Sequence, residues 1–364
     1  MIETREVNAQ DLENPVIAAM SENNHEQLLF CNDNATGLKA IIAVHNTVLG
    51  PSLGGTRMWV YNNELEAIND VMRLSRGMTY KNAISGLNLG GGKAVIIGDS
   101  RSMKSEALFR RFGKFVNSLG GKYITAEDVG ISPQDMVWVN METEYVAGLP
   151  GKSGDPSPVT AFGTYMGMKA CAKKQFGSDS LTGKKVAVQG VGHVGEYLVK
   201  HLVEENAEVF VTDIYEPTLQ RIAKEYGVKV VGLDEIYDVD MDIYAPCALG
   251  ATVNDDTLSR LKCSIIAGAA NNQLAIETKH GQAVLDKGII YAPDYALNAG
   301  GVINVYAEVA SKSAEWALQK AEDIYTTIYD IIDRSQKENI PASAIANKMA
   351  EERIQAIGNV KLPM

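Results

Sequence analysis

The sequence predicts an α/β protein of two domains with further helices at its C-terminal end, and three observations support this class. The chain has 364 residues, which is enough for two domains that each bury a core. Glycine, proline and serine are dense at residues 148–158, as is typical of a domain boundary. After that segment, short apolar strands alternate with helical patterns. We therefore expect a first domain at residues 1–150 and a second at residues 151–335.

The composition argues against several kinds of partner. The formal net charge of −11 disfavours nucleic acid and anionic membranes. No apolar run has the length of a transmembrane helix and the N-terminus has no signal-peptide character, so we expect a cytoplasmic protein. The five histidines form no metal-binding motif, so we expect no metal site. The cysteines are scattered and typical of reduced thiols: Cys31, Cys171, Cys247 and Cys263.

Alternation and short apolar runs predict the strands of the first domain, and apolar residues spaced by three and four positions predict its helices. The predicted strands are 37–48, 94–97 and 123–125, and the predicted helices are about 14–21, 64–76 and 105–119.

Two lysines, Lys81 and Lys93, lie among small and apolar residues with no acid between them. Glycines 90–92 lead into Lys93 and an apolar strand, and successive glycines suit a place where something approaches the backbone closely. A lysine in that setting is a candidate for a lowered pKa and acid–base chemistry, although a solvated lysine on a glycine loop explains the same residues. A phosphate-binding P-loop does not fit, because Leu87 replaces its glycine and Ala94 its serine or threonine.

Two further features of the first domain suit a substrate. A turn is predicted at residues 49–57, where Gly54 and Gly55 offer backbone amides that a carboxylate could use, although a plain turn explains them too. Glu127 and Asp128 follow a predicted strand, where the sheet fixes a carboxylate and the loop leaves it accessible. Paired acids are also common on ordinary surfaces.

The second domain opens with a pattern that is typical of dinucleotide binding. A strand predicted at 185–189 runs directly into Gly190-Val-Gly-His-Val-Gly195 and a helix, and the next strand, 208–212, ends at Asp213. The glycines permit a tight turn and a close approach of pyrophosphate, which the helix N-terminus stabilises. Asp213 would accept hydrogen bonds from both ribose hydroxyls and repel a 2′-phosphate, which favours NAD over NADP.

We therefore predict a Rossmann-type, doubly wound domain. Its further strands are predicted at 228–231, 242–245, 264–267 and 289–292. An apolar stripe predicts a long helix at about 314–335, and a last helix is predicted at about 342–357. We expect the C-terminal residues 336–364 to pack back on the first domain or on another subunit.

In combination, these motifs resemble those of the amino acid dehydrogenases, the superfamily of glutamate, leucine, phenylalanine and valine dehydrogenases, and most of all its leucine-type members. The resemblance runs from about Leu28 to Gly358. It is carried by residues 53–58, 78–81, 90–93, 125–128, 190–195, 268–272 and 298–301.

The resemblance implies roles for individual residues. Lys93 is implied to be catalytic, Asp128 to be the general base, and Lys81 to bind the substrate carboxylate. The other implied substrate-binding residues are Gly54, Gly55, Met78, Asn272, Leu53, Ala126, Val302 and Val305. The implied cofactor-binding residues are Thr160, Gly190, Val191, Gly192, His193, Val194, Gly195, Asp213, Cys247, Ala248, Ala270, Asn271 and Asn272. His193 departs from the pattern, which has asparagine there, and we expect little effect on NAD binding.

The implied activity is the reversible, NAD-dependent oxidative deamination of an L-amino acid to a 2-oxo acid and ammonia, by a homo-oligomer. Leu53 and Val305 stand where the glutamate enzymes have lysine and serine, so an anionic side chain would lose its water without gaining a partner. We therefore expect leucine, valine and isoleucine as substrates and glutamate to be excluded. A phenylalanine or valine dehydrogenase is the alternative.

Other classes of function explain the sequence less well. A nucleotide-binding module without catalysis would have no reason to keep both Lys93 and Asp128. A dehydrogenase of 2-hydroxy acids would need a histidine–acid relay, which the placement of the five histidines does not suggest.

Overall fold

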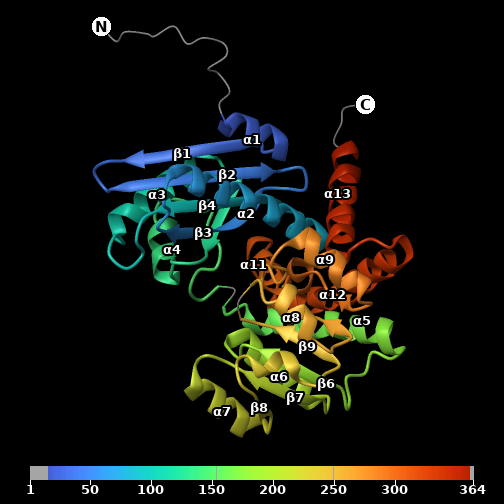
Figure 1. Ribbon diagram of the computed structural model, residues 1–364. Coiled ribbons are helices and arrows are strands. Elements are labelled where there is room, and N and C mark those ends of the chain that lie inside the picture. The colour runs from blue at the N-terminus through green and yellow to red at the C-terminus, as the bar shows by residue number, and fades with distance from the viewer. Residues whose placement is uncertain (1–14, 153, 249, 361–364) are drawn as a thin grey trace, which may run out of the picture. The chain divides into compact units, whose positions relative to one another are not determined.

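The part of the chain that the structure describes, residues 15–152, 154–248 and 250–360, carries two separate β-sheets (Figure 1). This computed structural model divides into two compact units. Unit 1 comprises the residues up to Tyr80 together with Asn88–Pro150, and unit 2 comprises Lys81–Leu87 and the residues from Gly151 onward. Each unit contains one sheet. Within the described ranges, no helix is long and apolar enough to cross a membrane.

The sheet of unit 1 is mixed. Its strands are β1 (Gln27–Asp33), β2 (Leu38–Asn46), β3 (Ser52–Trp59), β4 (Gly90–Ile97) and β5 (Tyr123–Glu127). Their order across the sheet is β1-β2-β4-β3-β5. Strand β2 is antiparallel to both of its neighbours, whereas β3 is parallel to β4 and β5. The carboxyl ends of β3, β4 and β5 therefore lie at the same edge.

Helices cover both faces of this sheet, because successive side chains of a strand point to opposite sides. On one face, Ile42 and Val44 of β2 pack with helices α3 (Glu106–Ser118) and α4 (Pro133–Asn140). On the other, Ile41 and Ala43 pack with helices α1 (Pro15–Asn23) and α2 (Glu64–Ile84). The fully buried phenylalanines of α3 each contribute about 2–3 kcal/mol through burial; they are Phe109 and Phe112.

The turn predicted at residues 49–57 is wrong for most of its length, because strand β3 begins at Ser52. Glycine is rare in strand interiors, which is why the sequence favoured a turn. In the structure a Cβ on Gly54 would collide with the carbonyl oxygen of Gly92, and one on Gly55 with that of Glu127. The two glycines are thus needed for the close approach of β4 and β5 on either side.

The sheet of unit 2 is parallel throughout, and its topology confirms the predicted doubly wound fold. Its strands are β6 (Lys185–Gln189), β7 (Glu208–Thr212), β8 (Lys229–Val230), β9 (Ile243–Pro246), β10 (Ile265–Ile266) and β11 (Ile290–Tyr291). They are ordered β11-β10-β9-β6-β7-β8. The order reverses between β6 and β9, and in such folds ligands bind beyond the strand ends at that point.

The helices of unit 2 surround this sheet. They include α5 (Ser157–Phe176), α6 (His193–Glu204), α7 (Glu216–Tyr226), α8 (Asp255–Arg260), α9 (Glu277–Asp286), α10 (Asp294–Leu297), α11 (Gly300–Val309), α12 (Ala314–Glu338) and α13 (Ala342–Val360). Helices α5 and α12 pack closely, since a Cβ on Gly163 would approach Ile324 Cδ1 to 2.5 Å. The predicted apolar stripe of α12 is buried at Ala317, Ala321, Ile324, Ile328 and Ile331.

The expectation that the C-terminal residues 336–364 pack back on the first domain or on another subunit stays a prediction. Helix α13 contacts α12 and α9, both in unit 2. Its half-buried Arg353 donates hydrogen bonds to the carbonyl oxygens of Ala83 at 3.1 Å and Leu87 at 2.7 Å. These two residues belong to the short segment 81–87 that is part of unit 2. Arg353 therefore ties α13 to the last turn of α2, which carries Lys81.

Candidate active site

Lys93 and Asp128, predicted to be catalytic, form an ion pair inside unit 1. Lys93 points from β4 with only 7% of its surface exposed, and Asp128 directly follows β5. Burial raises the pKa of the Asp128 carboxyl, but the charge and hydrogen bond of Lys93 and the charge of Arg57 outweigh it. The pKa of Asp128 is therefore below its ordinary value, and the carboxylate stays ionised at neutral pH.

Arg57 is a member of this site that the sequence did not single out. Its Nε lies 3.6 Å from Oδ2 of Asp128, and its Nη1 lies 3.0 Å from Oδ2 of Asp70. Tyr61 donates a hydrogen bond of 2.8 Å to the same oxygen of Asp70. Arg57 lay within the motif 53–58, but only the pairing of β3 with β5 brings it to Asp128.

The glycines around this pair are explained by close packing. A Cβ on Gly91 would collide with Thr79 of helix α2, and one on Gly92 would lie 2.7 Å from Ser52 Oγ. Tyr123 donates a hydrogen bond of 2.7 Å to the carbonyl oxygen of Gly54. The predicted use of the Gly54 and Gly55 amides for a carboxylate stays a prediction, since packing alone accounts for both residues.

The residues predicted to line an apolar pocket belong to both units. In unit 1, Leu53 and Ala126 are buried on β3 and β5, and the Met78 side chain lies beside Gly54. In unit 2, Val302 is buried and Val305 is half-buried, both on α11.

Lys81, predicted to bind the substrate carboxylate, lies on the last turn of α2 within unit 2. Its Nζ donates a hydrogen bond of 2.6 Å to Oδ1 of Asn298. Nδ2 of Asn298 in turn donates to the carbonyl oxygen of Ala269 at 3.0 Å and to Oδ1 of Asn271 at 2.7 Å. Asn272, beside it, has a positive φ of 52°. The structure thus brings Lys81 together with the Ala270–Asn272 segment.

The predicted fingerprint has the geometry that a dinucleotide requires. Gly190 has a φ of 100° and its Cβ would lie 2.5 Å from that of Ala248. A Cβ on Gly195 would collide with the Gly190 carbonyl oxygen, whereas one on Gly192 would have no atom of the described chain within 4 Å. Gly192 begins helix α6 without a side-chain cap in the described structure, so the first amides of α6 suit an anion.

Asp213 lies beside this loop at the end of β7. Its carboxylate accepts hydrogen bonds of 2.8 Å from the backbone N–H groups of Val191 and Tyr215. These bonds hold the carboxylate next to the fingerprint, as the sequence predicted from its spacing. Residues 190–195 and Asp213 therefore fit a dinucleotide.

The other predicted cofactor-binding residues lie on several segments of unit 2. Cys247 follows β9, and burial raises the pKa of its thiol to about 12, so it stays protonated at neutral pH. Its Sγ accepts from the backbone of Ala269 at 3.5 Å. Thr160 lies near the start of α5, with its Oγ1 3.1 Å from where a Cβ on Gly301 would lie. His193 is exposed at the first position of α6, and Val194 is half-buried next to it.

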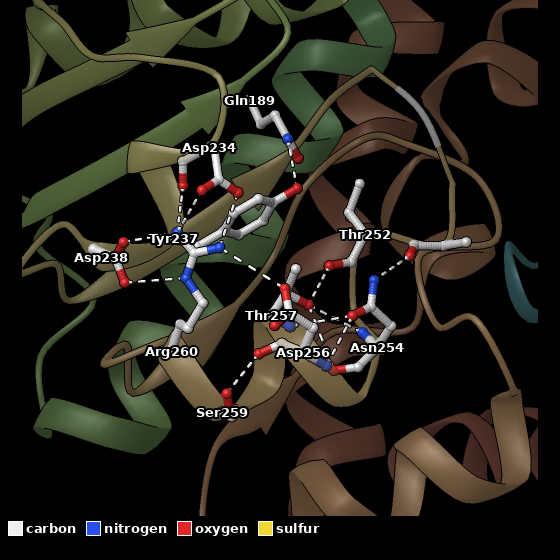
Figure 2. A network of polar contacts seen from close by, with 11 residues as sticks. Gln189, Asp234, Tyr237, Asp238, Thr252, Asn254, Asp256, Thr257, Ser259 and Arg260 are labelled. Carbon is white, nitrogen blue, oxygen red and sulfur yellow. Dashed lines mark hydrogen bonds and ion pairs between the residues drawn. The ribbon is translucent and has the colours of Figure 1, made fainter.

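A network of polar contacts that includes Gln189, Tyr237 and Arg260 was not predicted (Figure 2). Gln189, the last residue of β6, donates from Nε2 to the hydroxyl of Tyr237 at 2.8 Å and accepts from the hydroxyl of Tyr244. Beside Tyr237, Arg260 pairs with Asp234 and Asp238. These contacts fix the end of β6 directly before Gly190. Among the described residues, no group of three histidine, cysteine or acidic side chains is placed to hold a metal.

A unit that fits a dinucleotide, joined in one chain to a unit with a buried lysine paired to an aspartate, defines an oxidoreductase of the amino acid dehydrogenase class. The family model "Glu/Leu/Phe/Val dehydrogenase, dimerisation domain" matches residues 25–145, and the "Glutamate/Leucine/Phenylalanine/Valine dehydrogenase" model matches residues 151–215 and 212–359. The chain belongs to this Glu/Leu/Phe/Val dehydrogenase family, which confirms the predicted resemblance. Its cofactor is accordingly a nicotinamide dinucleotide.

Individual relatives agree with this assignment. The chain is 57% identical over 339 residues to leucine dehydrogenase of Bacillus subtilis (strain 168), covering 92% of this chain and 93% of the relative. It is 54% identical over 347 residues to leucine dehydrogenase of Geobacillus stearothermophilus, covering 94% of each. It is similar in structure to L-tryptophan dehydrogenase from Nostoc punctiforme, with a TM-score of 0.87, 43% identity and coverage of 94% of this chain and 99% of that one.

Proposed function

We propose that this enzyme catalyses the reversible, NAD-dependent oxidative deamination of leucine, valine and isoleucine to the 2-oxo acids and ammonia. The ion pair between the buried Lys93 and the half-buried Asp128 is the observation that carries the proposal. Deamination needs a group that takes a proton from the attacking water and a group that gives one to the departing ammonia. A lysine and a carboxylate in direct contact can exchange the proton that these two steps require.

The chain's own residues divide the work as follows. Bound nicotinamide supplies the hydride acceptor. Lys81 binds the substrate carboxylate, and Asp128 takes a proton from the α-amino group before hydride leaves Cα. Lys93, in its neutral form, takes a proton from the water that attacks the resulting iminium carbon. Asp128 then returns its proton to the nitrogen of the carbinolamine. As the carbon–nitrogen bond breaks, the ionised Asp128 accepts the proton of the carbinolamine hydroxyl, so that ammonia leaves and the 2-oxo acid forms.

We also propose NAD rather than NADP as the cofactor. The Asp213 carboxylate is held by Val191 and Tyr215, and a 2′-phosphate there would face a negative charge. A ribose with both hydroxyls free could instead donate to the same carboxylate.

Substrate choice rests on the apolar residues predicted to line the pocket. Within unit 1, Leu53 is 3% exposed, and its side chain cannot pair with a carboxylate. Burying an anionic substrate side chain against Leu53 without a partner costs several kcal/mol, which is enough to exclude glutamate. An aromatic ring is disfavoured only by shape, which is worth about 1–3 kcal/mol.

Two proposals concern the state of the protein in the cell. We propose a homo-oligomer, supported by the match of residues 25–145 to a family model described as a dimerisation domain. We propose the cytoplasm as its location, since all four cysteines are free thiols.

The experiment that tests the proposed function follows NADH by absorbance in both directions. L-Leucine should support NAD reduction at alkaline pH, and 4-methyl-2-oxopentanoate should support NADH oxidation only when ammonium is present. Oxidation of NADH by the 2-oxo acid without ammonium would contradict deamination and indicate a hydroxy-acid dehydrogenase.

A further inference from the structure

Asn298 lies in the turn between α10 and α11 of unit 2. It is 4% exposed, and its side-chain amide bonds to Lys81, Ala269 and Asn271. Its backbone N–H donates to the carbonyl oxygen of Asp294 at 2.8 Å, which fixes the residue in the turn. The sequence placed Asn298 in a family motif without giving it a role.

The direction of this amide follows from the chemistry of its partners. The Lys81 ammonium can only donate a hydrogen bond and the Ala269 carbonyl can only accept one. Oδ1 of Asn298 must therefore face Lys81, and Nδ2 must face Ala269. Because Nδ2 also donates to Asn271, the Asn271 amide must present its oxygen to Asn298 and direct its own NH2 group elsewhere. The buried Asn298 side chain thus sets the direction in which the NH2 group of Asn271 points.

The same contacts join two kinds of binding residue. In the proposed function, on which this inference rests, Lys81 binds the substrate carboxylate, and the family resemblance implies that Asn271 contacts the dinucleotide. A cation on Oδ1 polarises the Asn298 amide and strengthens the hydrogen bonds that its NH2 group donates. Fixing Lys81 and Asn271 before binding also removes part of the cost of ordering them.

We propose that Asn298 is a positioning residue that holds Lys81 and Asn271 in one hydrogen-bonded row and couples amino acid binding to dinucleotide binding. By linkage, a carboxylate at Lys81 then tightens dinucleotide binding by the same factor as the dinucleotide tightens carboxylate binding. A purely structural asparagine would contribute to folding and leave this factor unchanged.

The test measures binding without turnover. The dissociation constant of NADH is titrated by fluorescence with and without saturating 4-methylpentanoate, which has the carboxylate and side chain of leucine but no amino group. The ratio of the two constants is the coupling factor, and we expect a value of about 5–150 in the unmodified enzyme. A ratio of one there would overturn the inference.

Two substitutions at Asn298 separate the two ends of the row. Asn298→Ala removes all three side-chain hydrogen bonds. It should raise the dissociation constant of NADH and the KM for leucine by about tenfold each, and reduce the coupling factor to near one. Asn298→Asp keeps an acceptor for Lys81 but loses both donated bonds. The KM for leucine should therefore stay within about threefold of that of the unmodified enzyme, whereas NADH binding should weaken and the coupling should be lost.

A double-mutant cycle with Lys81→Ala adds a check that does not depend on one variant's folding. Lys81→Ala should itself weaken NADH binding. Its effect on that binding should not add to the effect of Asn298→Ala, because both substitutions break the same row of hydrogen bonds. Asn347→Ala on α13 is the matched control, since its side chain bonds to Tyr295 and Glu277 instead. Unchanged coupling in Asn298→Ala, or fully additive effects, would overturn the inference. Failure of the proposed function would show separately, as missing leucine turnover in the unmodified enzyme.

Discussion

Arg57 Nε lies 3.6 Å from Oδ2 of Asp128, so a second cation faces the carboxylate that already pairs with Lys93. Both cations lower the pKa of Asp128. Removing Arg57 should therefore raise the pKa of Asp128. Since the proposed base must be ionised, the acid limb of kcat/KM should move to higher pH in Arg57→Met, by about one unit.

The matched control for this prediction is Arg73→Met. Arg73 contacts the same Asp70 at 3.1 Å, but its side chain is 61% exposed. Its removal should leave the pH profile in place. An acid limb that is unmoved in Arg57→Met would show that Arg57 does not act on the base.

Lys93→Ala should abolish turnover while leaving NADH binding nearly intact. Lys93 belongs to unit 1, whereas the fingerprint and Asp213 belong to unit 2. The loss of an acid–base group predicts a fall in kcat of about 10²–10⁴-fold. The measurements are steady-state kcat and NADH titration, with the exposed Lys39→Ala as control. Residual activity within tenfold of the original would remove Lys93 from its proposed role.

Asp213→Ser combined with Ile214→Arg should shift cofactor preference toward NADP. The first change removes the carboxylate that would repel a 2′-phosphate, and the second adds a cation at a residue that is 84% exposed and so has room for it. The ratio of kcat/KM for NADP to that for NAD should rise by about tenfold or more. Equal use of both cofactors by the unmodified enzyme would contradict the role given to Asp213.

The buried histidine pair of unit 1 should make stability depend on pH. His45 bonds to Thr79 Oγ1 at 2.8 Å and to the Asn23 carbonyl oxygen at 2.9 Å, and its ring centroid lies 4.7 Å from that of His25. Burial chiefly, with the charge of His25, lowers the pKa of His45 to about 4 from an ordinary 6.5. Between these values the unfolded chain binds more protons, so the free energy of unfolding falls as the pH drops from 6.5 toward 4.

The loss over that range should be about 2–3 kcal/mol, and it appears as a falling Tm. His45→Gln should flatten the dependence, whereas the exposed His193→Asn should preserve it. A Tm that is constant between pH 7 and 5 in the unmodified enzyme would refute this account of His45.

The doubly wound unit was predictable because its signals are local. The strand at 185–189, the fingerprint and Asp213 follow one another within thirty residues, and each has a short-range physical reason. The predicted long helix was equally local, since its apolar stripe lies on one face of α12.

What the sequence did not show depends on contacts between distant residues. Strand β3 resembled a turn because Gly54 and Gly55 are needed only once β4 and β5 lie beside them. Arg57 reaches Asp128 through the pairing of β3 with β5. Asn298 meets Lys81 across 217 residues of chain. Spacing along the sequence carries no signal for such contacts.

The proposed activity is the oxidative deamination of amino acids with apolar side chains, and a panel of L-amino acids tests it. NAD reduction should be measured at alkaline pH as kcat/KM for leucine, valine, isoleucine, methionine, phenylalanine and glutamate. We expect leucine, valine and isoleucine to rank highest, followed by methionine and then phenylalanine, with glutamate undetectable. Measurable glutamate turnover, or phenylalanine in first place, would contradict this expectation.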